Sequence, residues 1–335
     1  MTGGADRVSL VAALTHTPVL TVSQWRETTP LVRYLIAVRA PVLAMTLAAA
    51  ALGGALAWRH GAIDVVAWAV CALGLLLAHA TNNLLNDLTD SLLGIDRGNY
   101  FRTQYGTHVL EHGLMSRAEL AGSTAATGAA ALAAGLWLVA HVGSDVAWLL
   151  GAGALLLVLY TYPLKRLGLG ELAVLLVWGP LMVGGTDRIA SHAWHAGAVW
   201  VGVTSGLLPT AVIFGKHLDK LGFDSARGIG TLPVRLGAAR TRLAIVAMSL
   251  TPYPAIAALA ACGELPWTAA CVLAALPAGL RAVRAFRQVA PRERPLDYPP
   301  DVWPLWYSAY AFAHARLFGM MLLSSFVAAW IVRCL

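Results

Sequence analysis

Acidic and carboxamide side chains gather at the end of a long apolar stretch, Val65 to Ala80. Asn83, Asp87 and Asp90 follow an N-x3-D-x2-D spacing, and Asp96 lies a little beyond them. On a continuous helix, positions i, i+4 and i+7 share one face, so the three side chains would form one stripe of oxygens. Ionisable groups at membrane depth are costly and by default mark a functional site.

A second acidic pair, Asp219 and Asp224, follows another apolar stretch and precedes the glycine-containing segment 228–237. We expect the two carboxylates to share one face of a continuing helix, as residues about one turn apart do. The glycines predict a turn that brings backbone close to a ligand.

Facing carboxylates would repel each other unless cations lay between them. Oxygen-rich sites suit Mg²⁺, which commonly binds a few carboxylates together with substrate phosphates. The sequence therefore predicts that Asp87, Asp90, Asp219 and Asp224, with Asn83, bind Mg²⁺ that bridges a diphosphate.

Basic side chains near the two acidic groups could bind the remaining diphosphate oxygens. The candidates are Arg102, Lys165 and Lys216. Lys165 could equally be an anchor that sets membrane orientation. Three further side chains could line a carbocation or acceptor site or could simply pack at the interface: Tyr105, Tyr160 and His217.

The elements that position these groups are membrane helices. Of the 335 residues 58% are hydrophobic and 12% are charged, whereas about a quarter are charged in a soluble domain. Because a spanning helix needs about 20 apolar residues, we expect an all-α membrane protein with about nine helices around an apolar chamber. The predicted spans are 31–57, 65–90, 118–141, 146–163, 171–187, 196–218, 242–262, 266–286 and 304–331. We expect residues 1–30 to form a surface arm and residues 31–335 one transmembrane domain.

Lys and Arg alternate between the predicted connections. They are concentrated in the N-terminal arm and after the second, fourth, sixth and eighth spans, and are few elsewhere. The positive-inside rule then predicts a cytoplasmic-membrane protein with its N-terminus in the cytoplasm, its C-terminus outside and both acidic groups in a cytoplasmic polar cap. The net charge of +7 fits membrane topology, and no nucleic-acid-binding motif accompanies it.

The motifs resemble those of the UbiA superfamily of intramembrane prenyltransferases. The run from Asn83 to Asp96 is similar to the first acidic motif of its menaquinone-pathway branch, which attaches a polyprenyl chain to dihydroxynaphthoate. Four other segments share the resemblance: Tyr160–Pro163, Gly168–Glu171, Trp178–Thr186 and Asp224–Gly237.

The resemblance implies that the four aspartates are catalytic. Mg²⁺ would bind a prenyl diphosphate, the diphosphate would leave, and an aromatic quinone-precursor-like acceptor would capture the allylic cation inside a water-excluding chamber. The same motifs fit a membrane terpene cyclase of the superfamily, which needs no acceptor. An ion-coupled transporter is a third interpretation, disfavoured because both acidic groups lie at one face rather than at the midplane.

Overall fold

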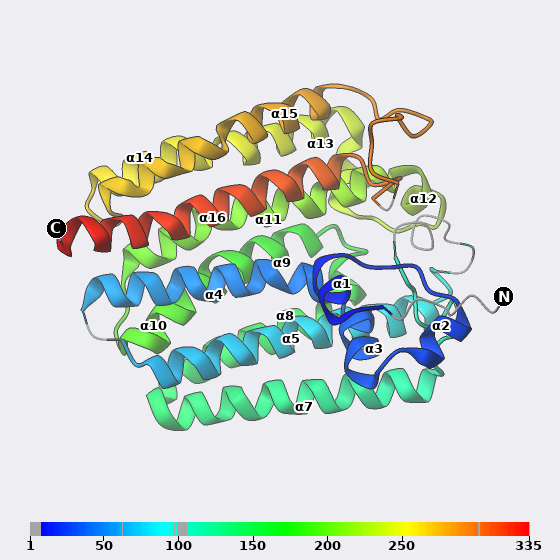
Figure 1. Cartoon of the computed structure of the whole chain (residues 1–335), viewed down its shortest axis with the longest axis horizontal. Helices are drawn as coiled ribbons and strands as arrows, with labels where there is room; N and C mark the ends of the chain where they lie inside the picture. The colour runs from blue at the N-terminus through cyan, green and yellow to red at the C-terminus, as the bar shows by residue number, and fades with distance from the viewer. Residues whose placement is uncertain (1–7, 62, 97, 99–105, 301, 335) are drawn as a thin grey trace.

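The structure is a computed structural model that describes residues 8–61, 63–96, 98, 106–300 and 302–334. Within that part of the chain all regular structure is helical, and nine helical segments are long and apolar enough to cross a membrane. The predicted all-α membrane fold is therefore confirmed. The helices run side by side along the long axis of the molecule (Figure 1).

The spans comprise single helices and broken ones. The single helices are α4 (Ala40–His60), α5 (Val65–Leu92), α7 (Arg117–Val142), α11 (Ala196–Asp219) and α16 (Tyr307–Cys334). The broken spans join α8 (Ala147–Leu159) to the flanking stretches Ser144–Val146 and Tyr160–Leu164, α9 (Gly170–Leu176) through Val177–Gly184 to α10 (Gly185–Ser191), α13 (Leu232–Leu250) to α14 (Pro252–Ala261), and Trp267–Ala275 to α15 (Leu276–Arg287).

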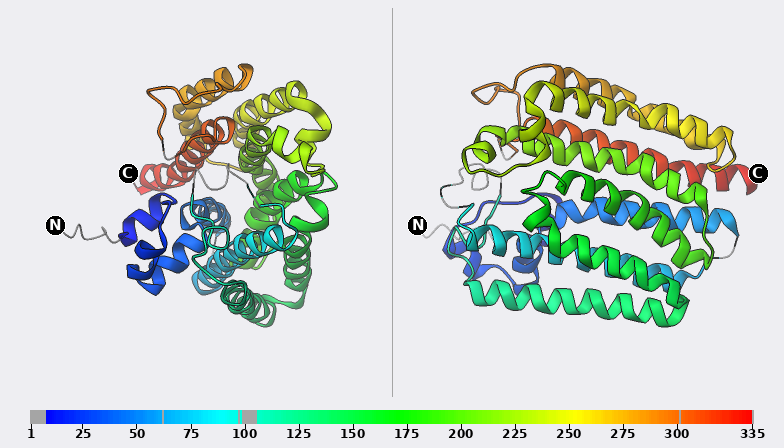
Figure 2. Two further views of the ribbon diagram at one scale, coloured as in Figure 1. Left: turned by 90° about the vertical axis from the view of Figure 1, so that its right-hand side faces the viewer. Right: turned by 180° about the vertical axis from the view of Figure 1, so that it is seen from behind.

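The spans close into a ring. Contacts run from α4 through α5 and α7 to α8, from α11 through α13 and α15 to α16, and from α16 back to α4. The stretch Val177–Gly184 contacts both α8 and α11 and so joins the two arcs. A view along the bundle shows the helices arranged around the middle of the molecule (Figure 2).

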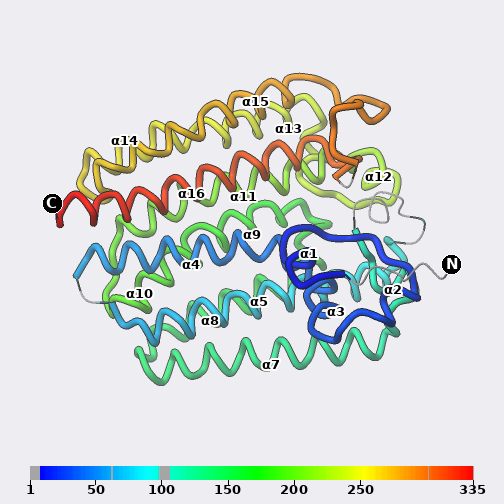
Figure 3. Tube along the Cα trace, viewed as in Figure 1, coloured from blue at the N-terminus to red at the C-terminus, as the bar shows by residue number. Residues whose placement is uncertain are grey.

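One end of the bundle carries the short helices α1 (Leu10–Thr15), α2 (Val22–Glu27), α3 (Pro30–Ala37) and α12 (Leu221–Ala226), and α16 ends at the other (Figure 3). Residues 8–30, which the sequence predicted to be a surface arm, pack against the bundle through Ala13, Leu20 and Trp25. We call this the cap end and the other the far end.

Two span boundaries differ from the sequence prediction. The first apolar stretch is not one helix: α3 ends at Ala37, Arg39 adopts the left-handed conformation (φ 57°), and α4 begins at Ala40. The seventh span begins at Leu232 rather than near residue 242, and it is broken at Gly237, whose backbone is non-helical (φ 77°). A hydropathy pattern contains neither signal.

Two prolines break helices beside the middle of the ring. The residues before Pro163 and Pro180, Tyr162 and Gly179, have non-helical backbone angles, as expected because the proline ring disfavours helical geometry in its predecessor. At Gly179 the chain also packs closely on α11: a Cβ added to Gly202 would lie 2.8 Å from the Gly179 carbonyl oxygen. The breaks redirect the helices where Tyr160 and Trp178 face inward.

Candidate active site

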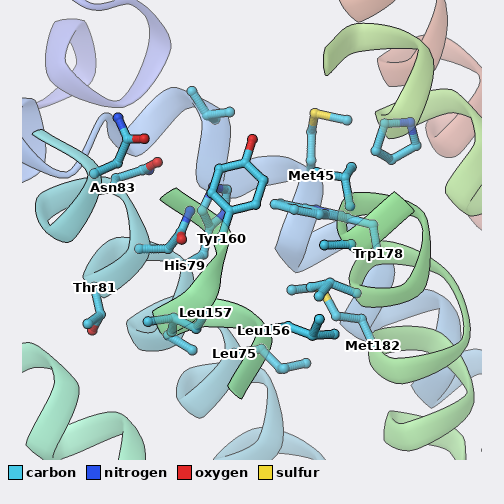
Figure 4. A pocket seen from close by; sticks show the side chains of 18 of the residues that line it. Met45, Leu75, His79, Thr81, Asn83, Leu156, Leu157, Tyr160, Trp178 and Met182 are labelled. Carbon is cyan, nitrogen blue, oxygen red and sulfur yellow. The ribbon is translucent and has the colours of Figure 1, made fainter. Parts of the chain in front are cut away.

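An apolar cavity of about 780 Å³ lies inside the ring, within the size range of ligand-binding pockets. Its inner wall includes Leu75, Leu156 and Met182, and two large aromatic side chains, Tyr160 and Trp178, face it (Figure 4). Asn83, Asp90 and Lys165 line the same cavity. The chamber that the sequence predicted is present, with a polar mouth at the cap end.

The first acidic motif lies on the last turns of α5, as predicted. Asn83, Asp87 and Asp90 are all buried, and the helix continues to Leu92. Asn83 Nδ2 donates to the Val38 carbonyl oxygen at 2.8 Å. That bond ties the motif to the break between α3 and α4.

Each aspartate of this motif faces a cation. Asp87 forms an ion pair with Arg39, and Asp90 Oδ2 accepts a hydrogen bond from Lys165 Nζ at 2.9 Å. Burial alone would lower the pKa of Lys165, but the charge and hydrogen bond of Asp90 raise it above its ordinary value. Lys165 therefore carries its charge into the wall of the cavity rather than anchoring at the lipid interface.

Asp96 lies beyond the helix, as expected, and is held by a buried histidine. His108 Nε2 lies 2.8 Å from Asp96 Oδ2, and the His108 side chain is fully buried. This pair ties Asp96, just after α5, to His108 further along the chain. Arg102 and Tyr105, two of the predicted site residues, lie outside the described residues.

The second acidic pair is divided between two helices, so the predicted single helical face is wrong. α11 ends at Asp219, Lys220 leaves the helical conformation, and α12 begins at Leu221. Asp224 is completely buried, and its Oδ1 lies 3.6 Å from Lys220 Nζ. Neither of its oxygens accepts a hydrogen bond from the part of the chain that the structure describes.

Asp219 has a different environment. Its Oδ1 accepts from the Tyr307 backbone N–H at 2.9 Å, and its Oδ2 accepts from the Ser308 N–H at 3.1 Å and from Ser308 Oγ at 2.9 Å. A carboxylate at a helix N-terminus satisfies unpaired N–H groups and interacts favourably with the helix dipole. The geometry thus indicates that Asp219 holds the start of α16. It does not support the predicted metal-binding role of Asp219.

The remaining predicted side chains line the cavity. They are Tyr160, His217 and Lys216. His217 Nδ1 lies 2.6 Å from Glu171 Oε1, and both side chains are buried. The same carboxylate oxygen accepts the Leu232 N–H at 3.2 Å, so Glu171 holds His217 and the start of α13 together.

Sequence reasoning missed two polar groups on the cavity wall and gave a third, His79, only as a histidine that could be a ligand, an acid–base group or a packing residue. Arg39 and Lys220 face carboxylates from the cap end, and His79 lies deeper, 2.8 Å from Thr46 Oγ1 and edge-on to Trp178. Arg39 had a signal, because it interrupts an apolar run in which charge is costly. His79 had none beyond its residue type.

Comparison of the chain with known proteins identifies its family. The model of the UbiA prenyltransferase family matches residues 46–297. The 1,4-dihydroxy-2-naphthoate octaprenyltransferase of Mycobacterium tuberculosis (strain ATCC 25618 / H37Rv) is 30% identical over 308 residues, covering 84% of this chain and 93% of the relative. The enzyme of that name from Escherichia coli (strain K12) is 29% identical over 218 residues, covering 62% of this chain and 70% of the relative.

Solved structures share the fold. A UbiA homolog from Aeropyrum pernix K1 superposes with a TM-score of 0.59 at 20% identity, over 88% of this chain and 98% of that one. A UbiA homolog from Archaeoglobus fulgidus bound to DMAPP and Mg²⁺ superposes with a TM-score of 0.58 at 15% identity, over 86% and 98%. These findings confirm the resemblance seen in the motifs. The chain belongs to the UbiA prenyltransferase family.

Proposed function

We propose that this prenyltransferase moves a polyprenyl group from a prenyl diphosphate to an aromatic, dihydroxynaphthoate-like acceptor. The observation that carries the proposal is a set of carboxylate–cation pairs at the cap end whose cations line the apolar cavity: Asp87 with Arg39, Asp90 with Lys165, and Asp224 with Lys220. A diphosphate suits the charged mouth and a polyprenyl tail suits the apolar wall. The names of the two relatives support the acceptor class.

The donor set fits Mg²⁺. Both oxygens of Asp224 and Oδ1 of Asp90 are buried without a hydrogen-bond partner among the described residues, and buried polar atoms ordinarily have one. Asp87, Asp90 and Asp224, with Asn83, would hold the ion through oxygen atoms, which magnesium prefers. When bound, Mg²⁺ stabilises the negative charge that develops on the leaving diphosphate. The A. fulgidus homolog bound to DMAPP and Mg²⁺ supports this choice.

The chain's own cations bind and orient the substrate. Arg39, Lys165, Lys216 and Lys220 all line the cavity and would contact diphosphate oxygens through charge-assisted hydrogen bonds. The prenyl carbon–oxygen bond breaks, its electron pair leaves with the diphosphate, and an allylic cation remains. Tyr160 and Trp178 line the cavity in which that cation would form (Figure 4), and aromatic rings attract cations.

Capture of the cation completes the reaction. The apolar wall excludes water, which would otherwise quench the cation. A ring carbon of the acceptor forms the new carbon–carbon bond, and aromaticity returns when that ring loses a proton. His217, oriented by Glu171 on the cavity wall, is placed to accept it. We also propose that the cap end faces the cytoplasm, on the strength of the Lys and Arg alternation.

The test uses the full chain reconstituted in liposomes with Mg²⁺ and geranylgeranyl diphosphate, with and without 1,4-dihydroxy-2-naphthoate. We expect a prenylated naphthoate product only when acceptor is present. A cyclic hydrocarbon or alcohol formed without acceptor would replace the transferase proposal with the terpene-cyclase alternative. Ion flux without diphosphate release, and with no prenylated product, would favour the transporter.

A further inference from the structure

A second cluster of titratable side chains lies at the far end of the bundle, away from the cavity mouth. His60 ends α4, Asp187 lies in the first turn of α10, and His195 precedes α11. Figure 1 shows α10 and the end of α4 together, opposite α1 to α3. The proposed prenyl transfer uses none of these residues.

The three side chains converge closely. His195 Nδ1 lies 2.8 Å from Asp187 Oδ2, and His60 Nδ1 lies 3.2 Å from Asp187 Oδ1. The two imidazole rings stack, with centroids 3.6 Å apart and an interplanar angle of 24°. One ligand atom from each residue lies within 4.8 Å of the other two.

The carboxylate at the centre needs positive charge. The Asp187 side chain is 0% exposed, whereas the His60 and His195 side chains are 21% and 26% exposed. The neighbouring Arg188 does not supply that charge, since its Nε and Nη2 donate to Asp145 at 3.0 and 2.8 Å. Two protonated imidazoles stacked this closely would repel each other. A single divalent cation compensates the buried carboxylate without that repulsion.

We propose that His60, Asp187 and His195 bind a divalent transition-metal cation such as Zn²⁺. Two imidazole nitrogens and one carboxylate oxygen are donors that suit zinc and its neighbours rather than magnesium. The partial exposure of both histidines leaves a solvent-facing side through which the ion enters and on which water completes the coordination. The site is thus chemically distinct from the all-oxygen donor set at the cap end.

A metal here would join three elements that wall the cavity. The ligands come from α4, α10 and the start of α11, and α10 also contributes Gly185, Thr186 and Ile189 to the cavity lining. α4 and α10 already pack tightly, since a Cβ on Gly53 would lie 2.6 Å from Thr186 Cβ. The ion would therefore hold α10 in place and fix the inner end of the prenyl chamber.

A neighbouring cluster provides a matched control. His141 and His192 each place Nε2 near the same oxygen, Oδ2 of Asp64, at 3.0 and 3.1 Å. Asp64 Oδ1 instead accepts the Ala67 N–H at the start of α5. This cluster has the same residue types at the same end, but its three ligand atoms do not all lie within 4.8 Å of one another, as those around Asp187 do.

The experiment measures metal binding by the full chain in detergent, purified through a tag without histidine. Cobalt(II) serves as the probe, because its visible absorption reports nitrogen ligation and tetrahedral geometry, and zinc is then counted by elemental analysis. We expect one equivalent in the wild type. The double variant His60→Asn/His195→Asn should bind at least about tenfold more weakly, since even the loss of an outer-shell partner costs about 10- to 100-fold. His141→Asn/His192→Asn should bind as the wild type does.

Each outcome decides the proposal. Equal cobalt spectra for the wild type and His60→Asn/His195→Asn would overturn it, as would the absence of a nitrogen-ligated spectrum in the wild type. Monodisperse elution and a wild-type circular dichroism spectrum verify that each variant is folded. Should the double variant misfold, the single variant Asp187→Asn takes its place, with the same expected loss. Because the readout is spectroscopic, failure here leaves the proposed transferase function untouched.

Discussion

Replacing Asp224 or Asp219 with asparagine should separate two carboxylates that look equivalent in the sequence. Asp224 is buried with both oxygens lacking hydrogen-bond partners among the described residues. Asp219 instead accepts hydrogen bonds from Tyr307 and Ser308 at the start of α16. We therefore expect Asp224→Asn to impair catalysis and Asp219→Asn to impair stability.

The magnitudes follow from these contacts. Losing one preorganised charge that stabilises a transition state costs about 3 kcal/mol, which corresponds to about a 100-fold slower reaction. We expect that loss of turnover for Asp224→Asn. In Asp219→Asn, the carboxamide would offer one acceptor oxygen in place of two and no charge. Because a hydrogen bond to a charged group contributes about 1.5 to 3 kcal/mol, this variant should lose about 2 kcal/mol of stability while retaining most of its turnover.

The assay pairs two measurements on the same preparations. Prenyl transfer is followed by product formation from a labelled prenyl diphosphate at saturating Mg²⁺, and stability by fluorescence-detected thermal unfolding in detergent. The assignment fails if Asp224→Asn turns over at the wild-type rate. It fails equally if Asp219→Asn unfolds like the wild type yet is as inactive as Asp224→Asn.

Three further predictions test the site and its support. Gly215→Ala should cost about 1–3 kcal/mol of stability, because the added Cβ would lie 2.7 Å from the Ser308 backbone nitrogen, whereas the control Gly222→Ala meets nothing within 4 Å and should unfold like the wild type. Asp90 raises the pKa of Lys165 in the folded state above its ordinary value. The difference in stability between the wild type and Lys165→Met should therefore be constant at neutral pH and should shrink only as the pH rises above about 10.4, the pKa of lysine in the unfolded chain. Thermal unfolding of both proteins from neutral to alkaline pH measures this difference. Chelation by EDTA should abolish product formation and excess Mg²⁺ should restore it, whereas activity that persists in EDTA would remove magnesium from the mechanism.

Periodicity and composition predicted the fold well because both signals are local. A spanning helix must satisfy its own backbone in lipid, so each apolar run of sufficient length predicts one helix. The prediction failed at Arg39, where a left-handed residue splits the first run into two helices. It failed again after Asp219, where the helix stops at Lys220. Both breaks are stabilised by contacts with distant residues, which a window of hydropathy does not contain.

The candidate site was predictable to the extent that it lies on one helix. Asn83, Asp87 and Asp90 share a face because their spacing requires it. The different roles of Asp219 and Asp224 depend on α16, because Asp219 binds the start of that helix, 88 residues away in the chain. The His60–Asp187–His195 cluster likewise joins distant residues, since His60 and Asp187 are 127 positions apart in the chain. Neither histidine is part of a recognisable motif.

The pairing of charges at the cap end explains how the site can exist before substrate arrives. A lone buried carboxylate is strongly destabilising, and so is a lone buried cation. Arg39, Lys165 and Lys220 remove that cost by facing the carboxylates. When magnesium and diphosphate enter together, the carboxylates can pass to the metal and the cations to the phosphate oxygens, so no charge loses its partner. If magnesium bound alone, Arg39, Lys165 and Lys220 would lose their carboxylate partners. If diphosphate bound alone, the carboxylates would lose their cationic partners. Magnesium and diphosphate should therefore bind cooperatively. The left-handed backbone conformation of Arg39 is unfavourable by itself, but it directs the guanidinium to the place where this exchange of partners occurs.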